Sequence, residues 1–258
     1  MRADLSGQVV FITGAAGGIG RATAHRLAAN GASIVVADID ADGAGRVAAE
    51  LPSALAVSMD VRRAEDAKRA VDATLEKFGR IDVLINNAGV NSMKERVNID
   101  KFSEDEWRRI VGIDLDGLYV VSHAALQPMV AHGHGRIVNI ASVIGVAGFR
   151  LQSAFSAAKA GMIHLTRSMA LELGPKGILV NSLAPGSVLT EGTKQLFYGD
   201  DGTFRAQMAG FMSHIPLGRP AHVEEIAEGI LFLCAPENSY MTGHLMMVDG
   251  GWTAGFMF

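Results

Sequence analysis

The sequence predicts an α/β fold in which helices cover both faces of a parallel sheet. Seven short β-rich stretches alternate with longer stretches of helical period along the 258 residues. This alternation is typical of a sheet whose parallel strands are joined by helical crossovers. The β-rich stretches are also apolar almost throughout, as strands are when both faces of their sheet are covered. We therefore expect a doubly wound sheet of seven strands.

The predicted strands are spread over the whole chain without an internal repeat. They are residues 8–13, 33–38, 54–60, 82–87, 136–142, 178–184 and 245–250. No Pro/Ser-rich linker interrupts the series. The spread favours a single domain over residues 1–258.

Helices are expected between these strands. The first ends at Asn30-Gly31, which is a common helix stop. Residues 62–78 place small and aliphatic side chains on one helical face. Ser103 with Glu106 forms a capping box that predicts a helix beginning there. A later helix carries position 155 and runs to about Leu173, before a Gly-Pro pair that ends it.

The composition excludes several classes of protein. Hydrophobic residues make up 49% and charged residues 19% of the chain, which excludes a disordered protein. A net charge of −4 argues against nucleic acid as a partner. No apolar stretch reaches the ~18 residues of a membrane span, and the N-terminus lacks the pattern of a signal peptide. We therefore expect no membrane association and a cytoplasmic location.

The histidines and the cysteine give no sign of metal or thiol chemistry. The eight histidines show no metal-ligand spacing, so no metal is expected. Cys234 lies in the apolar run GILFLCA. We expect a buried, inert thiol there rather than a nucleophile.

Two stretches break the alternation of strands and helices. They are residues 90–102 and 185–220, and each follows the end of a predicted strand, where open α/β sheets bind ligands. Long loops in a compact domain are usually functional. Within the second stretch, residues 190–215 mix apolar side chains with acidic ones and predict a lid with an apolar underside.

The turn after the first predicted strand has the residues of a phosphate cradle. It reads TGAAGGIG at 13–20. Gly14, Gly18 and Gly20 allow a tight turn and a close approach of backbone to pyrophosphate, and the following helix N-terminus supplies unpaired N–H donors. Asp38 ends the second strand, and its carboxylate can accept hydrogen bonds from an adenine ribose while repelling a 2′-phosphate. We therefore expect NAD rather than NADP, the alternative being a plain turn with a capping Asp.

Taken in order, several motifs resemble the short-chain dehydrogenase/reductase family over essentially the whole chain. They are TGAAGGIG at 13–20, Asp38, MDV at 59–61, NNAG at 86–89, Ser142, SAAK at 156–159 and PGSVLT at 185–190. The resemblance implies a single Rossmann-like domain with a seven-stranded parallel sheet. It also implies hydride transfer between a nicotinamide cofactor and a secondary alcohol or ketone.

The resemblance further implies which residues bind the cofactor. They are Gly14, Gly18, Ile19 and Gly20 in the turn, Asp38 at the ribose, Asp60 and Val61 at the adenine, Asn87, Ala88 and Gly89 beside the adenine ribose, Pro185, Gly186, Val188 and Thr190 at the nicotinamide carboxamide, and Lys159 at the nicotinamide ribose.

The family's catalytic positions are matched in part. Ser142 matches the Ser that holds the substrate oxygen, and Lys159 matches a Lys that supports a proton-transferring Tyr. That Tyr lies four residues before the Lys, on the same helix face, and its position holds Phe155. The position of an Asn that holds a relay water in the family holds Asp114.

Phe155 keeps an aromatic ring but has no O–H group, so the general acid/base is lost. Positioned proton transfer contributes ~10² to 10⁴-fold, so we expect strongly reduced activity. Asp114 could pair with Lys159, rebuild the water relay or carry a proton through water; alternatively it is a solvated carboxylate beside Asp116. Tyr119 is expected to pack in the core and to supply no proton.

Substrate contacts are expected from Ser142, Asn91 and Gln152, whose side chains can hydrogen-bond a hydroxyl, with Arg150 as a further candidate. A surface position is the alternative for the last three. The C-terminal sequence DGGWTAGFMF resembles family members that act on sugars and polyols. Its apolar end predicts a covering subunit, and the resemblance implies a homotetramer.

These observations predict an NAD-dependent oxidoreductase of secondary alcohols or ketones, with sugars and polyols among its candidate substrates. In it, Phe155 replaces the general acid/base Tyr, naturally or by engineering. The alternative is an NAD-binding homologue without turnover that serves as a sensor or assembly partner. A third possibility keeps catalysis with a different acid.

Overall fold

A parallel sheet forms the centre of the computed structural model. Within residues 2–92, 96–191, 193–194 and 209–255, which the structure describes, seven strands form this sheet in the order β3-β2-β1-β4-β5-β6-β9. The strands are β1 Val9–Thr13, β2 Ser33–Asp38, β3 Ala54–Ser58, β4 Val83–Asn86, β5 Gly135–Ile140, β6 Ile178–Pro185 and β9 Leu245–Val248. Every pairing is parallel, which confirms the predicted Rossmann-like fold.

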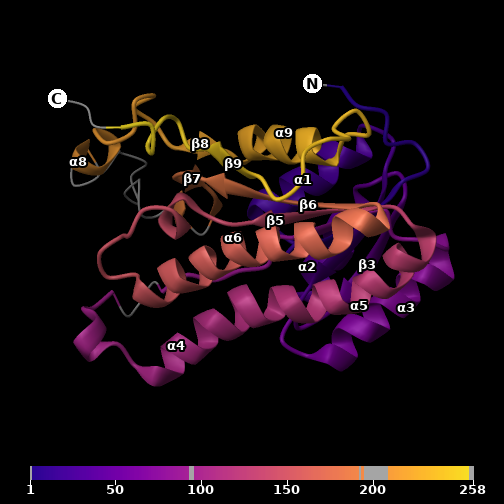
Figure 1. The fold of residues 1–258 in the computed structure, drawn as a ribbon, viewed down its shortest axis with the longest axis horizontal. Coiled ribbons are helices and arrows are strands. Elements are labelled where there is room, and N and C mark those ends of the chain that lie inside the picture. Colours follow the sequence, from indigo (N-terminus) through magenta and orange to yellow (C-terminus); the bar gives the residue numbers. More distant parts are fainter. Residues whose placement is uncertain (1, 93–95, 192, 195–208, 256–258) are drawn as a thin grey trace.

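Helices cover both faces of this sheet (Figure 1). They are α1 Gly18–Ala28, α2 Ala41–Ala49, α3 Ala64–Phe78, α4 Glu104–Val111, α5 Gly117–His132, α6 Ser153–Leu173, α8 Ala209–Met212 and α9 Val223–Cys234. One face packs against α3, α5 and α6, and the other against α1, α2 and α9. Alternate residues of a strand enter opposite layers, so Phe11 of β1 packs in the first and its neighbours Val10 and Ile12 in the second.

Several of the segments that connect strands and helices contain short turns of 3₁₀ helix. Residues 90–102 follow β4 and contain a short turn of 3₁₀ helix, η1 Ile99–Lys101. Another 3₁₀ turn, η3 Val143–Gly145, follows β5, and a third, η4 Gly174–Lys176, follows α6. The loops with η1 and η3 leave the carboxyl ends of β4 and β5 and therefore meet at one edge of the sheet, whereas η4 leads into the amino end of β6 at the opposite edge.

Some features have no counterpart in the sequence-based expectations. A π-helical segment, η2 Gly112–Asp116, connects α4 to α5. The two-residue strands β7 Val188–Leu189 and β8 Ala221–His222 pair in parallel outside the main sheet. Most of the predicted lid at 190–215 lies outside the described residues.

The expectation that Tyr119 packs in the core is wrong. Its side chain is exposed on α5, where its ring stacks on that of His123 at a centroid distance of 5.8 Å. The inward positions of α5 are taken instead by Leu118 and Val121. Tyr119 therefore points away from the sheet, because it falls on the opposite side of the helix from the residues that face the core.

Cys234 lies at the end of α9 with its side chain fully buried. Burial raises the pKa of its thiol to about 12, because the thiolate would lose its hydration. The expectation of a buried thiol is thus confirmed. No helix in the described part of the chain is long and apolar enough to cross a lipid bilayer.

Candidate active site

A cavity of about 470 Å³ opens at the carboxyl edge of the sheet. Loops after β4, β5 and β6 contribute its lining together with the first turn of α1, with α6 and with the π-helical segment. The residues predicted for cofactor, catalysis or substrate that line it are Ile19, Asn87, Gly89, Asn91, Asp114, Ser142, Gln152, Phe155, Lys159, Pro185, Gly186, Val188 and Thr190. Most of the predicted site residues therefore line one cavity.

The other predicted cofactor residues lie beside this cavity rather than in its wall. They are Gly14, Gly18 and Gly20 in the turn after β1, Asp38 at the end of β2, Asp60 and Val61 after β3, and Ala88 after β4. Because β3, β2, β1 and β4 are neighbours in the sheet, these residues follow its carboxyl edge away from the cavity. A dinucleotide that lay across the carboxyl ends of these strands would pass these residues in turn.

The glycine-rich turn admits no larger side chains at two positions. A Cβ at Gly14 would lie 2.9 Å from Ala88 Cα, and one at Gly20 would lie 2.2 Å from Gly14 O. Gly14 and Gly18 also have φ values of +63° and +51°, which L side chains rarely adopt. Asn87 fixes the turn, since its Nδ2 donates to Thr13 O and Gly14 O at 2.9 Å each.

The N-terminus of α1 is open to an anion. Its N-cap, Gly17, has no side chain to satisfy the first N–H groups of the helix. Those donors and the helix dipole suit a pyrophosphate. The cradle, the uncapped helix and the adjoining cavity together fit a bound dinucleotide.

Asp38 is half-buried at the end of β2. Its Oδ2 accepts a hydrogen bond from Ala16 N at 2.9 Å, and its Oδ1 accepts one from Asp40 N at 3.0 Å. These bonds hold the carboxylate against the glycine-rich turn. Each oxygen keeps a further lone pair that can accept from a ribose hydroxyl.

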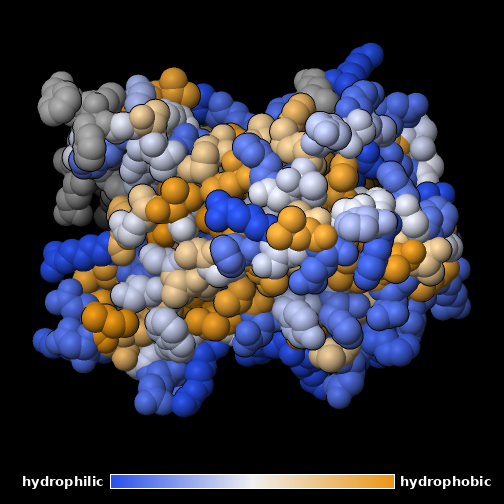
Figure 2. Space-filling view, viewed as in Figure 1, coloured by the Kyte–Doolittle hydropathy of each residue, from blue (hydrophilic) through white to orange (hydrophobic). Residues whose placement is uncertain are grey.

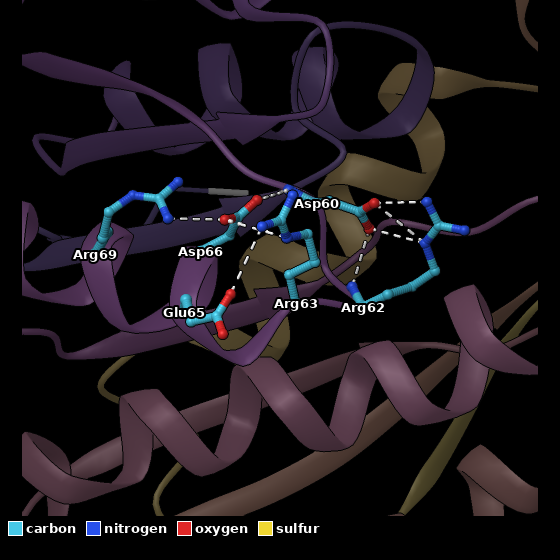
Figure 3. A network of polar contacts seen from close by, with 6 residues as sticks. All are labelled: Asp60, Arg62, Arg63, Glu65, Asp66 and Arg69. Carbon is cyan, nitrogen blue, oxygen red and sulfur yellow. Dashed lines mark hydrogen bonds and ion pairs between the residues drawn. The ribbon is translucent and has the colours of Figure 1, made fainter.

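Asp60, which is predicted to meet the adenine, belongs to a network of charged residues (Figure 3). Arg62 holds the Asp60 carboxylate through Nε and Nη2, with Nη2 2.6 Å from Oδ2, and this lowers the pKa of Asp60. Asp66 accepts from Asp60 N at 3.1 Å and pairs with Arg69 at 2.8 Å. An adenine that bound Asp60 would have to share the carboxylate with Arg62, a competitor that the sequence analysis did not identify.

Val61, which is predicted to meet the adenine, also packs closely against Gly117 at the start of α5. A Cβ at Gly117 would lie 2.7 Å from Val61 Cγ2, so the glycine lets α5 approach this residue closely. The contact fixes the loop after β3 against the start of α5.

Lys159 and Asp114 form a buried ion pair. Lys159 Nζ lies 3.2 Å from Asp114 Oδ2 and donates to Ile140 O at 2.9 Å. Asp114 Oδ1 accepts from Val90 N at 2.7 Å. Asp114 is fully buried whereas Asp116 is exposed, so the solvated reading of Asp114 is wrong.

The π-helical segment determines where Asp114 points. A π turn carries one extra residue, and such turns are frequent at functional sites. The segment sets Asp114 beneath the loop after β4, where a Cβ at Gly89 would lie 3.1 Å from its Oδ2 and 3.3 Å from Lys159 Nζ. The glycine therefore leaves space for both charged groups.

Phe155 lines the cavity one helical turn before Lys159. The Lys159 ammonium lies 5.5 Å from the centre of the Phe155 ring, within the range of a cation–π contact. The ring also packs against a small apolar cluster that includes Ile110 and Ala158. The ring thus fills its place in the wall but presents no proton.

Ser142 follows β5 and is buried at the base of the cavity. Its Oγ accepts a hydrogen bond from Ile144 N at 3.3 Å. A hydroxyl that accepts one bond can still donate its own proton. Ser142 is therefore free to donate to a ligand oxygen.

Gln152 and Asn91 contact each other across the cavity wall. Asn91 Nδ2 donates to Gln152 Oε1 at 2.8 Å, and Gln152 is buried. The surface reading of Gln152 is therefore wrong. Arg150, in contrast, is exposed and is absent from the cavity lining within the described residues.

Several lining residues were missed by the sequence analysis. Arg96, Phe149 and Trp252 line the cavity, although they come from three distant parts of the chain. Gly145, which does not line the cavity, was missed too, and a Cβ there would lie 2.7 Å from the backbone of Lys159. The tail carried a signal for Trp252, since DGGWTAG combines tight-turn glycines with one aromatic residue, but no local pattern indicated where the ring would lie.

A doubly wound parallel sheet with a glycine-rich first turn places the chain among the Rossmann-type α/β proteins. A family model described as enoyl-(acyl carrier protein) reductase matches residues 14–253. The chain is 42% identical to the trans-4-hydroxycyclohexanecarboxylate dehydrogenase of Sinomonas cyclohexanicum, over 96% of this chain and 93% of that protein. It belongs to the short-chain dehydrogenase/reductase family of oxidoreductases.

Two further relatives are also named as dehydrogenases. The cis-4-hydroxycyclohexanecarboxylate dehydrogenase of the same organism is 41% identical, over 96% of this chain and 97% of that protein. The meso-2,3-butanediol dehydrogenase of Serratia marcescens is 40% identical, over 96% of this chain and 95% of that protein.

A solved structure supports the same family. The 3-ketoacyl-(acyl-carrier-protein) reductase of Brucella melitensis, crystallised with NADH, superposes with a TM-score of 0.88 at 34% identity. The match covers 97% of this chain and 100% of that one.

Proposed function

We propose that this chain is an NAD-dependent oxidoreductase of a secondary alcohol or its ketone in which Phe155 replaces the general acid/base. The observation that carries the proposal is the meeting of Ser142, Lys159 and the Pro185–Thr190 stretch around one cavity. The family relationship supports hydride chemistry, and the NADH-bound relative supports the cofactor class. The half-buried carboxylate of Asp38 supports NAD over NADP.

The roles of the residues follow from their positions. When bound, the nicotinamide supplies the hydride acceptor or donor. Ser142 donates to the substrate oxygen and so orients the carbinol carbon. Lys159 places a positive charge near the site of proton transfer and is itself held by Asp114 and Ile140 O. The Phe155 ring helps to shape the cavity but has no proton to give, so proton transfer to or from the substrate oxygen is slow.

Two substrate classes have support from relatives. Butanediol dehydrogenase supports a polyol, in agreement with the resemblance of the C-terminal sequence. The two hydroxycyclohexanecarboxylate dehydrogenases support a hydroxy acid built on a carbon ring. Both classes offer a secondary alcohol to Ser142.

The experiment that tests this proposal restores the missing hydroxyl. Phe155→Tyr is expected to raise NADH formation by ~10² to 10⁴-fold, since that is the usual contribution of positioned proton transfer. The substrates are meso-2,3-butanediol, further polyols and both 4-hydroxycyclohexanecarboxylates. Phe155→Leu serves as the control, because it alters the side chain at the same position without adding a hydroxyl. No gain on any substrate would contradict the proposal.

A second candidate function is a dinucleotide-binding protein without turnover. The ion pair between Asp114 and Lys159 favours it, because Lys159 already has a buried counter-ion and needs no phenol beside it. This candidate predicts NAD binding by calorimetry together with no hydride transfer in a single-turnover assay, in the native chain and in Phe155→Tyr. If Asp114→Asn abolishes the native rate while Phe155→Tyr changes little, a different acid operates.

A homotetramer is part of the proposal. On the face formed by α4, α5 and α6, apolar side chains gather between hydrophilic ends (Figure 2). Trp107 of α4, Tyr119 of α5 and Leu171 of α6 have exposed side chains, which supports burial against other subunits. Light scattering of the purified chain measures the mass of the assembly.

A further inference from the structure

The outer wall of the cavity is apolar and aromatic. Phe149, Phe155 and Trp252 line it together with Val143 and Ile144. The rings of Phe149 and Trp252 meet edge to face, with their centres 6.1 Å apart. Such a wall suits a carbon ring better than a chain of hydroxyl groups, because it offers few hydrogen-bond partners.

Arg96 brings a positive charge to the cavity lining, and no counter-ion pairs with it among the described residues. Asp114 and Lys159, the other charged residues of the lining within the described chain, pair with each other. Arg96 is exposed, and in the part of the chain that the structure describes it forms no ion pair. Its Nε donates to Ser92 O at 3.3 Å, which leaves both terminal nitrogens available to a ligand.

The neighbouring arginine does not share this property. Arg109 pairs with Glu106, whose Oε2 lies 2.6 Å from its Nε, so its charge is balanced. Its Nη2 donates to Asn91 O at 3.3 Å and thereby ties the loop after β4 to α4. Arg109 therefore supports the loop before Arg96, while Arg96 has no ion-pair partner in the described ranges of the chain.

We propose that the substrate carries a carboxylate and that Arg96 binds it. The inference rests on the proposed function and selects the ring hydroxy acids from its two substrate classes. A guanidinium presents two parallel N–H donors that match the two oxygens of a carboxylate. With the hydroxyl held at Ser142 and the carboxylate at Arg96, the ring between them lies against the aromatic wall.

Calorimetry with a charged and a neutral probe tests this assignment. The probes are trans-4-hydroxycyclohexanecarboxylate and its carboxamide, which differ by one charge, each titrated with and without saturating NAD. We expect the native protein to bind the carboxylate at least about tenfold more tightly, the scale of a hydrogen bond to a charged group. Arg96→Gln should abolish this preference and change the affinity for the carboxamide by less than about twofold.

Two further variants make the result specific. Arg96→Lys keeps the charge without the paired donors and should retain part of the preference. Lys101→Gln removes an exposed cation of η1 that does not line the cavity, and it should leave the preference intact. A preference that falls equally in Lys101→Gln would show a general charge effect and would overturn the assignment.

The remaining outcomes separate this inference from the function it rests on. Equal affinities of the native protein for the two probes, no binding of either probe, or an undiminished preference in Arg96→Gln would each overturn it. Hydride transfer by Phe155→Tyr on neutral substrates without a carboxylate preference would leave the proposed function standing alone. A carboxylate preference without any transfer would support the binding site and contradict the proposed function.

Discussion

Asp114 and Lys159 place two opposite, buried charges side by side at the wall of the cavity. Each is also held by the backbone, Asp114 by Val90 N and Lys159 by Ile140 O. A buried pair of this kind adds little net stability, but removal of one partner leaves an uncompensated charge. The two residues therefore depend on each other.

Removal of the carboxylate should accordingly destabilise the whole protein. We expect Asp114→Ala to lower the free energy of unfolding by about 3–5 kcal/mol, because Lys159 remains buried without its counter-ion. Urea unfolding measures the change. Asp116→Ala is the matched control two residues away, and its exposed side chain should matter by less than about 0.5 kcal/mol. Similar losses in both variants would contradict the buried pair.

The choice of cofactor depends on the charge of Asp38. Asp38→Asn keeps one acceptor oxygen, so it retains one of the hydrogen bonds from Ala16 N and Asp40 N, and it removes the repulsion of a 2′-phosphate. We expect the ratio of the Kd for NADP to the Kd for NAD to fall about tenfold. Calorimetric titration with both cofactors gives the ratio, with Asp42→Asn on the exposed start of α2 as control. An unchanged ratio would count against the assignment of NAD.

At the scale of elements, the strands could be predicted well and the connections only in part. Each predicted strand end lies within two residues of the observed one, because burial on both faces demands a continuous apolar run. The π-helical segment has no such signature, since it depends on how α4 and α5 pack around Asp114. The strands β7 and β8 were missed because they pair two residues each across a long separation in sequence.

The start of α9 shows how an element carries a pH dependence. Glu225 accepts from His222 N at 2.8 Å and from Arg219 at 2.7 Å, and these bonds lower its pKa to about 2. A depressed carboxyl pKa stabilises the fold at pH values above the ordinary 4.5. This contribution is lost as the pH falls from there toward 2.

Glu225→Gln should therefore weaken the protein at neutral pH and flatten its acid response. Since the side chain is partly exposed, we expect a loss of about 0.5–1 kcal/mol at pH 7, the scale of a surface ion pair. The difference from the native protein should shrink as the pH falls below 4.5, as measured by urea unfolding at several pH values. Glu224→Gln, exposed in the same helical turn, is the control. A difference independent of pH would refute the linkage.

For the molecule as a whole, the sequence predicted the site more fully on its cofactor side than on its substrate side. The glycine-rich turn and Asp38 belong to local patterns whose spacing follows from the βαβ unit. Arg96 and Trp252 are isolated residues that reach the cavity only through the folding of separate segments. Their positions depend on tertiary packing, which leaves no periodic trace in the chain.

Cys234 offers a practical handle on the entire fold. It is the single cysteine of the chain, and it lies fully enclosed at the end of α9 with its thiol pKa raised to about 12. A thiol-specific reagent at neutral pH should modify it only when the protein opens, and NAD should slow that modification if it binds the folded state. The rate at which Cys234 is modified can therefore serve to screen ligands, without a dye or an added tag.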